Sequence, residues 1–205
     1  MVNQIFLLSL LLLSCIIGGA FSPGSSTKAQ NGDVVFHTSK SRQSSFIQVI
    51  TGSPLSHVGI VYIKNGKPLV LEAVNPVKIT PLQTWIKRGT AEKYILMRPR
   101  LALSDSDLNK MYTYGLKNLG KPYDMRFEWS DNRMYCSELV YKIYLAAGIE
   151  LCKPRRFTEY DLSSEQTIKE ITRRYGLESF NPLEKVVSPA DLRNSSKLVV
   201  VTDTY

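Results

Sequence analysis

Apolar residues recur at helical spacing directly after Cys136. From Glu138 onward they fall every three or four positions and stop at Gly148: Leu139, Val140, Ile143, Tyr144, Ala146 and Ala147. This pattern predicts a buried helix that carries Cys136 in its first turn. The unpaired backbone N–H groups and the positive dipole end of a first helical turn favour a thiolate over a thiol. Cys136 is therefore a candidate nucleophile.

Two β-rich runs, residues 56–63 and 67–73, flank the dipeptide Asn65-Gly66. Asn-Gly between two such runs is the strongest short signal for a β-hairpin, with both residues in a type I′ turn. The sequence therefore predicts a pair of antiparallel strands in this region, and the turn fixes how their residues pair.

The predicted register brings a histidine and a glutamate together. If Lys64 faces Lys67, then Gly59 lies opposite Glu72, and His57 shares their face of the sheet. Diagonal neighbours of this kind are about 7–8 Å apart, within reach of a long side chain. A carboxylate can then accept from one imidazole nitrogen and leave the other for a thiol. A lone strand histidine or glutamate is more often a satisfied or solvated residue, but the shared face around a glycine favours the catalytic interpretation.

The remaining pattern predicts further short elements of both kinds. Strands are expected at residues 34–36, 94–97 and 198–201. Helices are expected at residues 46–50, closed by Gly52, and at 80–85, 104–119 and 163–175. Together with the hairpin and the cysteine helix, these elements indicate an α+β protein.

The N-terminal twenty residues are interpreted as a targeting segment rather than as part of the fold. Residues 1–20 carry no charge, and residues 5–17 form an apolar block that is followed by Gly18-Gly19-Ala20, small residues typical of a cleavage site. This is typical of a signal peptide, although a basic residue near the start is missing. The alternative is lipoprotein processing with a lipid anchor at Cys15. We expect a polar linker at 21–31 and a single domain at 32–205.

Composition disfavours nucleic-acid binding and a fold held by disulfides. The chain has 205 residues, 43% of them hydrophobic, and a net charge of +8 without a run of basic residues. A solvated basic surface fits this better than nucleic-acid binding. Besides Cys15, only Cys136 and Cys152 are present, so the chain has no disulfide framework. Cys152 is expected to be a half-buried small residue.

The few metal-ligating residues show no pattern of a metal site. Neither the two histidines nor the cysteines have C-x-x-C or H-x-x-x-H spacing, so no metal and no cofactor is expected. His37 could act as a rival base for Cys136. The sequence offers it no orienting carboxylate, and we interpret it as a residue at the end of a strand.

Several motifs resemble a known family. Gly120-x-Pro122-Tyr123 followed by Tyr135-Cys136-Ser137-x-Leu139-Val140 is similar to the pattern of NlpC-type cell-wall cysteine peptidases. Here the His57 strand precedes the cysteine helix, which resembles the circularly permuted YiiX/YaeF-like branch and, more distantly, lecithin–retinol acyltransferases. Further matching segments are Gly32-Asp33, Ser56-His57, Leu71-Glu72-Ala73-Val74, Pro76-Val77, Thr80-Pro81-Leu82, Lys121, Asp124, Glu138 and Val187-Ser188-Pro189.

The resemblance implies a circularly permuted papain-like fold, in which a small antiparallel sheet packs on a central cysteine-bearing helix. It implies a thiol hydrolase of amide bonds, with relatives that act on acyl-lipid esters. By position, Cys136 would be the nucleophile, His57 the base and Glu72 the orienting group. Tyr135 and Glu138 replace an aspartate and a glycine of the parent peptidases, which puts their peptidoglycan specificity in doubt.

The expected function is that of an exported, periplasmic or otherwise extracytoplasmic hydrolase without a transmembrane span in the mature chain. It would cleave an amide or an ester in an envelope peptide, small amide or acyl lipid through a thioester. The Cys136 N–H, with Tyr123 or Tyr135, would stabilise the oxyanion, although both tyrosines can also be packing residues. The alternatives are an acyltransferase of the same fold and an inactive binding protein for an envelope ligand.

Overall fold

The computed structural model describes residues 29–176 and 179–205. The predicted signal peptide, the alternative lipid anchor at Cys15 and most of the predicted linker lie outside these residues. Within the two described ranges, no helix combines the length and apolar character needed to cross a membrane.

The described chain is built on a six-stranded sheet in which every neighbouring pair is antiparallel. In spatial order the strands are β4 (Lys78–Pro81), β3 (Lys67–Glu72), β2 (His57–Lys64), β1 (Val34–His37), β5 (Ile95–Pro99) and β8 (Leu198–Asp203). A separate two-stranded ribbon pairs β6 (Arg155–Arg156) with β7 (Lys185–Val186). The C-terminal strand β8 thus completes the sheet beside β5.

The hairpin register predicted from the sequence is confirmed. Lys64 pairs with Lys67, and the ladder continues from there toward the base of the hairpin. Asn65 and Gly66 have φ values of 51° and 72°, the left-handed conformation that a type I′ turn requires at both loop residues. The face shared by the residues at the base of the hairpin therefore follows directly from the Asn-Gly turn.

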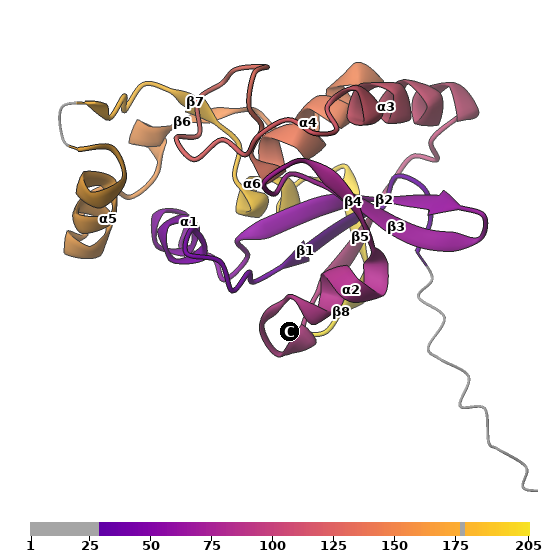
Figure 1. The fold of residues 1–205 in the computed structure, drawn as a ribbon, viewed down its shortest axis with the longest axis horizontal. Coiled ribbons are helices and arrows are strands. Elements are labelled where there is room, and N and C mark those ends of the chain that lie inside the picture. Colours follow the sequence, from indigo (N-terminus) through magenta and orange to yellow (C-terminus); the bar gives the residue numbers. More distant parts are fainter. Residues whose placement is uncertain (1–28, 177–178) are drawn as a thin grey trace, which may run out of the picture.

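Helices cover both faces of this sheet (Figure 1). Their bounds are α1 Ser44–Thr51, α2 Leu82–Lys87, α3 Asp105–Lys117, α4 Cys136–Ala146, α5 Glu165–Tyr175 and α6 Pro189–Arg193, with 3-10 turns at Thr90–Glu92 and Phe157–Glu159. Helices α3 and α4 lie over one face, α2 lies against the other, and α1 and α5 stand together at one end (Figure 1). The cysteine helix is confirmed, with Cys136 as its first residue.

Three apolar clusters hold these layers together. The largest joins α4, through residues such as Leu139 and Ile143, to one face of the sheet. The second packs Trp85 of α2 on the opposite face. The third lies beyond the end of the sheet and includes Phe46 of α1 and Phe127. Because α4 belongs to the first cluster, packing against the sheet fixes the position of its N-terminal residue.

Two features of the fold differ from the sequence prediction. Thr80 does not cap a helix, because it lies in β4 and α2 begins only at Leu82. The strands β6 and β7 and the helix α6 were not predicted. Elements of two to five residues are too short to show a hydrophobic period, and tertiary pairing decides their conformation.

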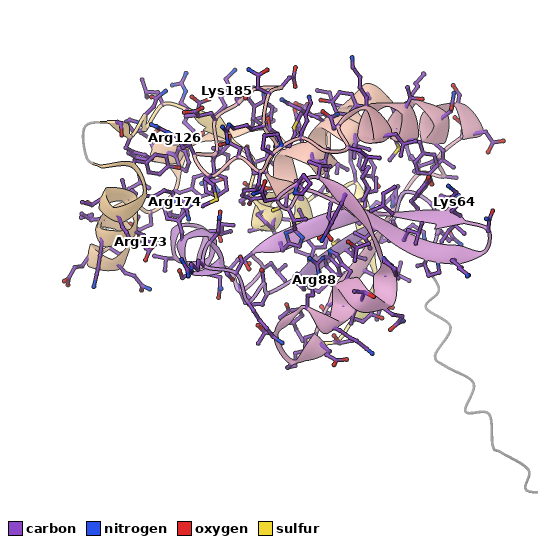
Figure 2. The ribbon with its side chains drawn as sticks, viewed as in Figure 1. Lys64, Arg88, Arg126, Arg173, Arg174 and Lys185 are labelled. Atoms are coloured by element: carbon purple, nitrogen blue, oxygen red, sulfur yellow. The ribbon has the colours of Figure 1, made fainter. Side chains whose placement is uncertain are left out.

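Basic side chains occur at separate places on the molecule (Figure 2). Lys64 lies at the tip of the hairpin, Arg173 and Arg174 lie on α5, and Arg88 follows α2. The positive charge is thus distributed over several elements and does not form a single stripe along one of them.

Candidate active site

Cys136 begins α4 and has a buried side chain, 1% exposed. Burial by itself raises the pKa of this thiol. Hydrogen bonds to the sulfur from His57, from the Val58 backbone N–H and from the Tyr123 hydroxyl, together with the charge of His57, outweigh burial and lower the pKa below its usual value. The first-turn position adds the positive end of the helix dipole. The site therefore favours a thiolate.

His57 connects this sulfur to a buried carboxylate. Its Nε2 donates to Glu72 Oε2 over 2.7 Å, which leaves Nδ1 as the ring nitrogen for Cys136. Burial lowers the pKa of His57, but the hydrogen bonds and charges of Cys136 and Glu72 outweigh it and raise the pKa to about 9. An imidazolium paired with a thiolate is the resting state that these shifts favour.

Glu72 is fully buried and is held by two further donors. Thr80 Oγ1 donates to Oε1 over 2.6 Å, and the Arg88 guanidinium donates to the same oxygen. Burial raises the pKa of Glu72, but the interactions with His57, Arg88 and Thr80 outweigh it and lower the pKa to about 2. Glu72 is therefore a carboxylate throughout the physiological range and can only accept from His57.

Gly59 allows the strands carrying these two residues to lie close together. A Cβ atom at this position would lie 2.4 Å from Val70 Cγ1, 3.2 Å from the Leu71 carbonyl oxygen and 3.5 Å from Glu72 Cβ. Any side chain here would push β3 away from β2. The glycine that the sequence places opposite Glu72 is thus needed for the contact between Glu72 and His57.

Tyr123 approaches the sulfur from the loop before α4. It forms a parallel bridge with Met134, and its backbone N–H donates to Asn75 Oδ1 over 3.4 Å. The hydroxyl contacts the Cys136 sulfur, and burial followed by the charge of the thiolate raises the pKa of Tyr123 well above its usual value. Tyr123 therefore remains a protonated hydrogen-bond donor.

Tyr135 is not brought together with the other four candidates. Its side chain is buried, and its hydroxyl accepts from the Val187 N–H over 3.2 Å. Its ring packs edge-on against Phe127, with 5.2 Å between the ring centroids. The geometry is that of the packing alternative, because the extended backbone of this N-cap residue directs the side chain toward the segment before α6.

His37 ends β1 and lies directly opposite His57 in the ladder. Its ring stacks on Trp85, with 3.9 Å between centroids, and its buried Nδ1 has no hydrogen-bond partner among the described residues. Burial, followed by the positive charges of His57, Arg88 and Lys40, lowers the pKa of His37 to about 2. No carboxylate of residues 29–176 or 179–205 is hydrogen-bonded to His37, so this histidine lacks the arrangement of a rival base.

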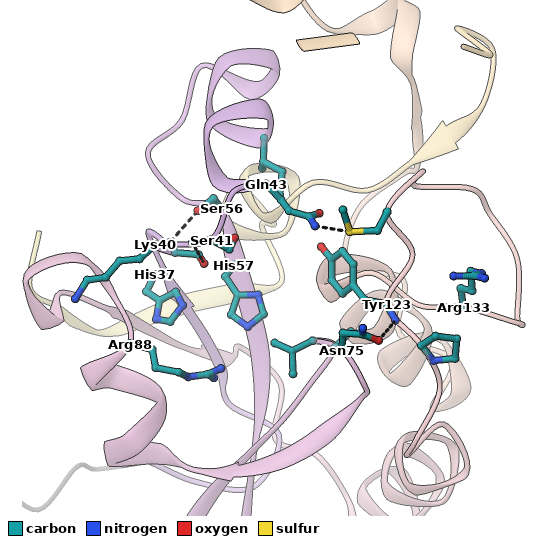
Figure 3. A pocket seen from close by; sticks show the side chains of 16 residues that line it. His37, Lys40, Ser41, Gln43, Ser56, His57, Asn75, Arg88, Tyr123 and Arg133 are labelled. Carbon is teal, nitrogen blue, oxygen red and sulfur yellow. Dashed lines mark hydrogen bonds between the residues drawn. The ribbon is translucent and has the colours of Figure 1, made fainter. Parts of the chain in front are cut away.

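A pocket of about 590 Å³ opens in front of these groups (Figure 3). His57 and Tyr123 line it, together with residues from the segment before α1 and from the loop after β3. The Cys136 sulfur lies behind His57 and Tyr123 and is not itself part of the lining. Both side chains also contact the sulfur, so the pocket adjoins the candidate nucleophile.

Three groups of the site were missed by the sequence analysis: Thr80, Arg88 and the Val58 N–H. Thr80 pairs with Val70, and so shares the face of Glu72, which a correct assignment of β4 would have revealed. Arg88 follows α2 at a position that no local pattern marks. The Val58 N–H approaches the sulfur only through the packing of α4 against β2.

Cys152 lies apart from this site. It is half-buried and is a free thiol, as Cys136 is. Burial, followed by the charges of Asp191 and Glu150, raises its pKa to about 12. The interpretation of Cys152 as a half-buried small residue is confirmed.

Comparisons with known proteins agree on one family. The model of a family described as permuted papain-like amidase enzymes, YaeF/YiiX, matches residues 28–202. The uncharacterized protein YiiX of Escherichia coli K12 is 40% identical over 198 residues, which cover 96% of each chain. A crystal structure described as the metalloprotein YiiX from Escherichia coli O157:H7 superposes with a TM-score of 0.81 at 41% identity, covering 86% of this chain and 98% of that one.

The word metalloprotein in that description refers to the relative. In residues 29–176 and 179–205 of this chain, no group of three or more His, Cys, Asp or Glu side chains is placed to hold a metal ion. His57 bonds to both Glu72 and Cys136, so the candidate ligand atoms of these three side chains are engaged with one another. The described residues do not fit a metal, and we derive no step through one.

The sequence comparisons and the fold thus indicate the same family. The six-stranded antiparallel sheet, the cysteine at the start of α4 and the strand order with histidine before cysteine are those of a permuted papain-like protein. A family match over nearly the whole chain and a full-length relative at 40% identity name the group. The chain belongs to the permuted papain-like amidase family, YaeF/YiiX.

Proposed function

We propose that this protein is an exported thiol hydrolase that cleaves an amide bond, or a related ester, through a Cys136-His57-Glu72 triad. The observation that carries the proposal is the buried chain of contacts from the Cys136 sulfur through His57 to Glu72 Oε2. Family membership supports amidase chemistry in general. The triad, the export and the choice of bond are our inference from the residues.

In the first step the Cys136 thiolate attacks the substrate carbonyl and a C–S bond forms. The negative charge moves to the carbonyl oxygen, where the unpaired Cys136 N–H at the start of α4 can donate to it. The incoming carbonyl displaces the Tyr123 hydroxyl from the sulfur, and this hydroxyl becomes a second donor for the oxyanion. Tyr135 has no part in this mechanism, because its hydroxyl lies against Val187.

The tetrahedral intermediate then collapses. The C–N or C–O bond breaks, and the protonated His57 gives its proton to the departing amine or alcohol, leaving a thioester on Cys136. Neutral His57 next removes a proton from water, and the hydroxide attacks the thioester carbonyl. The C–S bond breaks, the thiolate returns, and the product acid is released. Glu72 keeps the ring oriented in both steps.

An acyltransferase would use the same atoms with a different acceptor in place of water. The thioester would be attacked by an amine or an alcohol that occupies the pocket beside His57. This alternative follows from the resemblance to lipid-processing relatives, and its test is whether an added amine accelerates loss of the acyl group and appears in the product.

The experiment uses the chain from residue 21 onward with Cys152→Ala, so that Cys136 is its one thiol. Incubation with p-nitrophenyl acetate should add one acetyl group to Cys136, detectable by mass spectrometry, and the group should then hydrolyse. Cys136→Ser and His57→Ala should show no acetyl-thioester above background. Equal labelling of the His57→Ala variant would contradict the triad, and a stable acyl group released only by an added amine would favour the transferase.

A further inference from the structure

The active-site pocket carries an unbalanced positive charge. Its lining includes Lys40, Arg88 and Arg133 but no aspartate or glutamate. Glu72 lies behind His57 and is already bonded to both His57 and Arg88. Charges of one sign in a concave, low-dielectric site attract a ligand of the opposite sign. The lining therefore favours an anionic ligand.

Two of the three cations lie on the same side of the catalytic histidine. Figure 3 shows Lys40, Arg88 and His37 together on one side of His57, and Arg133 on the other side, beyond Tyr123. The charges of Lys40 and Arg88 both act on His37, which is consistent with their common position. The cluster of His37, Lys40 and Arg88 therefore adjoins the catalytic pair.

This cluster has more hydrogen-bond capacity than the surrounding protein satisfies. Lys40 forms no ion pair with any described residue, and its side chain is exposed. Arg88 donates to Glu72, but its buried Nε has no acceptor. The buried Nδ1 of His37 also lacks a partner. Because both of these atoms are buried, an anion in the pocket would meet the exposed Lys40 ammonium and the field of the Arg88 guanidinium.

We propose that His37, Lys40 and Arg88 form a subsite for an anionic oxygen group, a carboxylate or a phosphate, that the substrate carries on the His37 side of the scissile bond. Lys40 supplies the free charge, and Arg88 adds to it while holding Glu72. The inference rests on the proposed function, because it names the substrate class of the same site. A substrate without such a group binds less well but is cleaved by the same triad.

The test compares two alkylating reagents of similar size, in the Cys152→Ala background at low ionic strength. Iodoacetate is anionic and iodoacetamide is neutral, so the ratio of their rates at Cys136 reports the potential in the pocket. Lys40→Ala should lower this ratio about three- to ten-fold, the effect of one nearby charge in a partly screened site. Lys40→Glu should lower it further, and Lys40→Arg should preserve it.

A control variant distinguishes the effect of a charge in the subsite from the effect of the protein's overall charge. Lys87→Ala removes an exposed lysine of α2 that does not line the pocket, and should leave the ratio within two-fold. The iodoacetamide rate of each Lys40 variant serves as its own reference, because a change in the thiolate fraction of Cys136 alters both rates equally and cancels in their ratio. Inorganic phosphate and sodium acetate should each slow alkylation by iodoacetamide in a saturable way, and Lys40→Ala should weaken the protection about three- to ten-fold. The tighter of the two anions indicates which group the substrate carries.

Two results would overturn the inference. One is an unchanged ratio and unchanged protection in both Lys40→Ala and Lys40→Glu. The other is a loss of both effects in Arg133→Ala alone, which would move the anion to the opposite end of the pocket. The response of the iodoacetamide rate to His57→Ala is a separate readout. If His57→Ala lowers the iodoacetamide rate while the Lys40 variants leave the ratio of the two rates unchanged, the proposed function stands and only the subsite fails.

Discussion

His37 and His57 face each other on neighbouring strands, with 5.2 Å between their ring centroids. Both are buried, with exposures of 2% and 7%. Yet the pKa of His57 is raised to about 9 and that of His37 is lowered to about 2. Burial disfavours the charged form of both rings. The charge of Glu72 raises the pKa of both rings, but only His57 is hydrogen-bonded to that carboxylate and to a thiolate. These hydrogen-bond partners, and not the depth of burial, therefore decide which histidine carries a proton.

The two free cysteines repeat this difference. Burial raises the pKa of both thiols, and at Cys152 nothing offsets it, so that the pKa reaches about 12. At Cys136, three hydrogen bonds to the sulfur and the imidazolium charge reverse the direction. These pKa shifts predict one activated and one inert member of each residue type within a single fold. Paired variants can test this difference directly.

The largest expected effect on activity is that of the proposed nucleophile. Cys136→Ala should abolish thioester-dependent hydrolysis, a loss on the order of 10³-fold or more, since no other group can form the intermediate. Cys152→Ala should stay within two-fold of the parent. Hydrolysis of p-nitrophenyl acetate at pH 7.5 measures both. A large loss of hydrolysis in a folded Cys152→Ala variant would contradict the prediction that Cys136 alone supplies the active thiol.

The histidines should differ almost as strongly. His57→Ala removes the proposed general base and should lower kcat on the order of 10²- to 10⁴-fold. His37→Ala should lower kcat less than about ten-fold, because this ring stays neutral and has no orienting carboxylate. Steady-state kinetics with circular dichroism as a folding check measures the pair. Comparable losses of kcat in both variants would show that His37 acts in the proton transfer.

Glu72→Gln tests what the carboxylate contributes to the difference between the two histidines, because it leaves His57, like His37, without a hydrogen bond to a carboxylate. Without the carboxylate charge the imidazolium is less stable, so the pKa of His57 falls and the alkaline limb of the pH–rate profile, near pH 9 in the parent, moves to lower pH. We expect kcat to fall about 10- to 100-fold. A profile of kcat/KM from pH 5 to 10 tests the shift. An unmoved alkaline limb would mean that Glu72 does not act on His57.

The smallest effect is on stability. The lowered pKa of Glu72, about 2, adds stability above its usual value of 4.5 that is lost as the pH falls toward 2. The raised pKa of His57, about 9, adds stability below its usual value of 6.5 that is lost as the pH rises through 9. The lowered pKa of Cys136 acts in the opposite sense, because its thiolate adds stability that grows as the pH rises toward 9.0 and offsets the loss from His57 between pH 6.5 and 9. Urea unfolding should therefore show a stability difference between the parent and His57→Ala that persists from pH 6.5 to 9 and falls above pH 9. A difference that grows toward pH 10 would contradict these signs.

Much of the site follows from local sequence rules. The Asn65-Gly66 turn sets the hairpin register, and the register places His57, Gly59 and Glu72 on one face. The helical period after Cys136 places the thiol at a helix start. These are short-range rules, in which each residue constrains neighbours only a few positions away, and the structure bears out the register and the helix.

The parts that could not be predicted depend on tertiary packing. Arg88 reaches Glu72 only because α2 packs under the sheet, and Thr80 does so through the four-residue strand β4. Tyr135 precedes Cys136 directly, but which side of α4 its ring occupies depends on the distant Val187. The positive charge of the pocket likewise comes from segments far apart in sequence.

The pH dependence of Cys136 alkylation by iodoacetamide, in the Cys152→Ala background with and without His57→Ala, tests the central claim most directly. We predict a midpoint well below the value of about 8.5 for a free thiol, and a rise of this midpoint when His57 is removed. A midpoint near 8.5 that is the same with and without His57 would contradict the activated pair and the hydrolase that we infer from it.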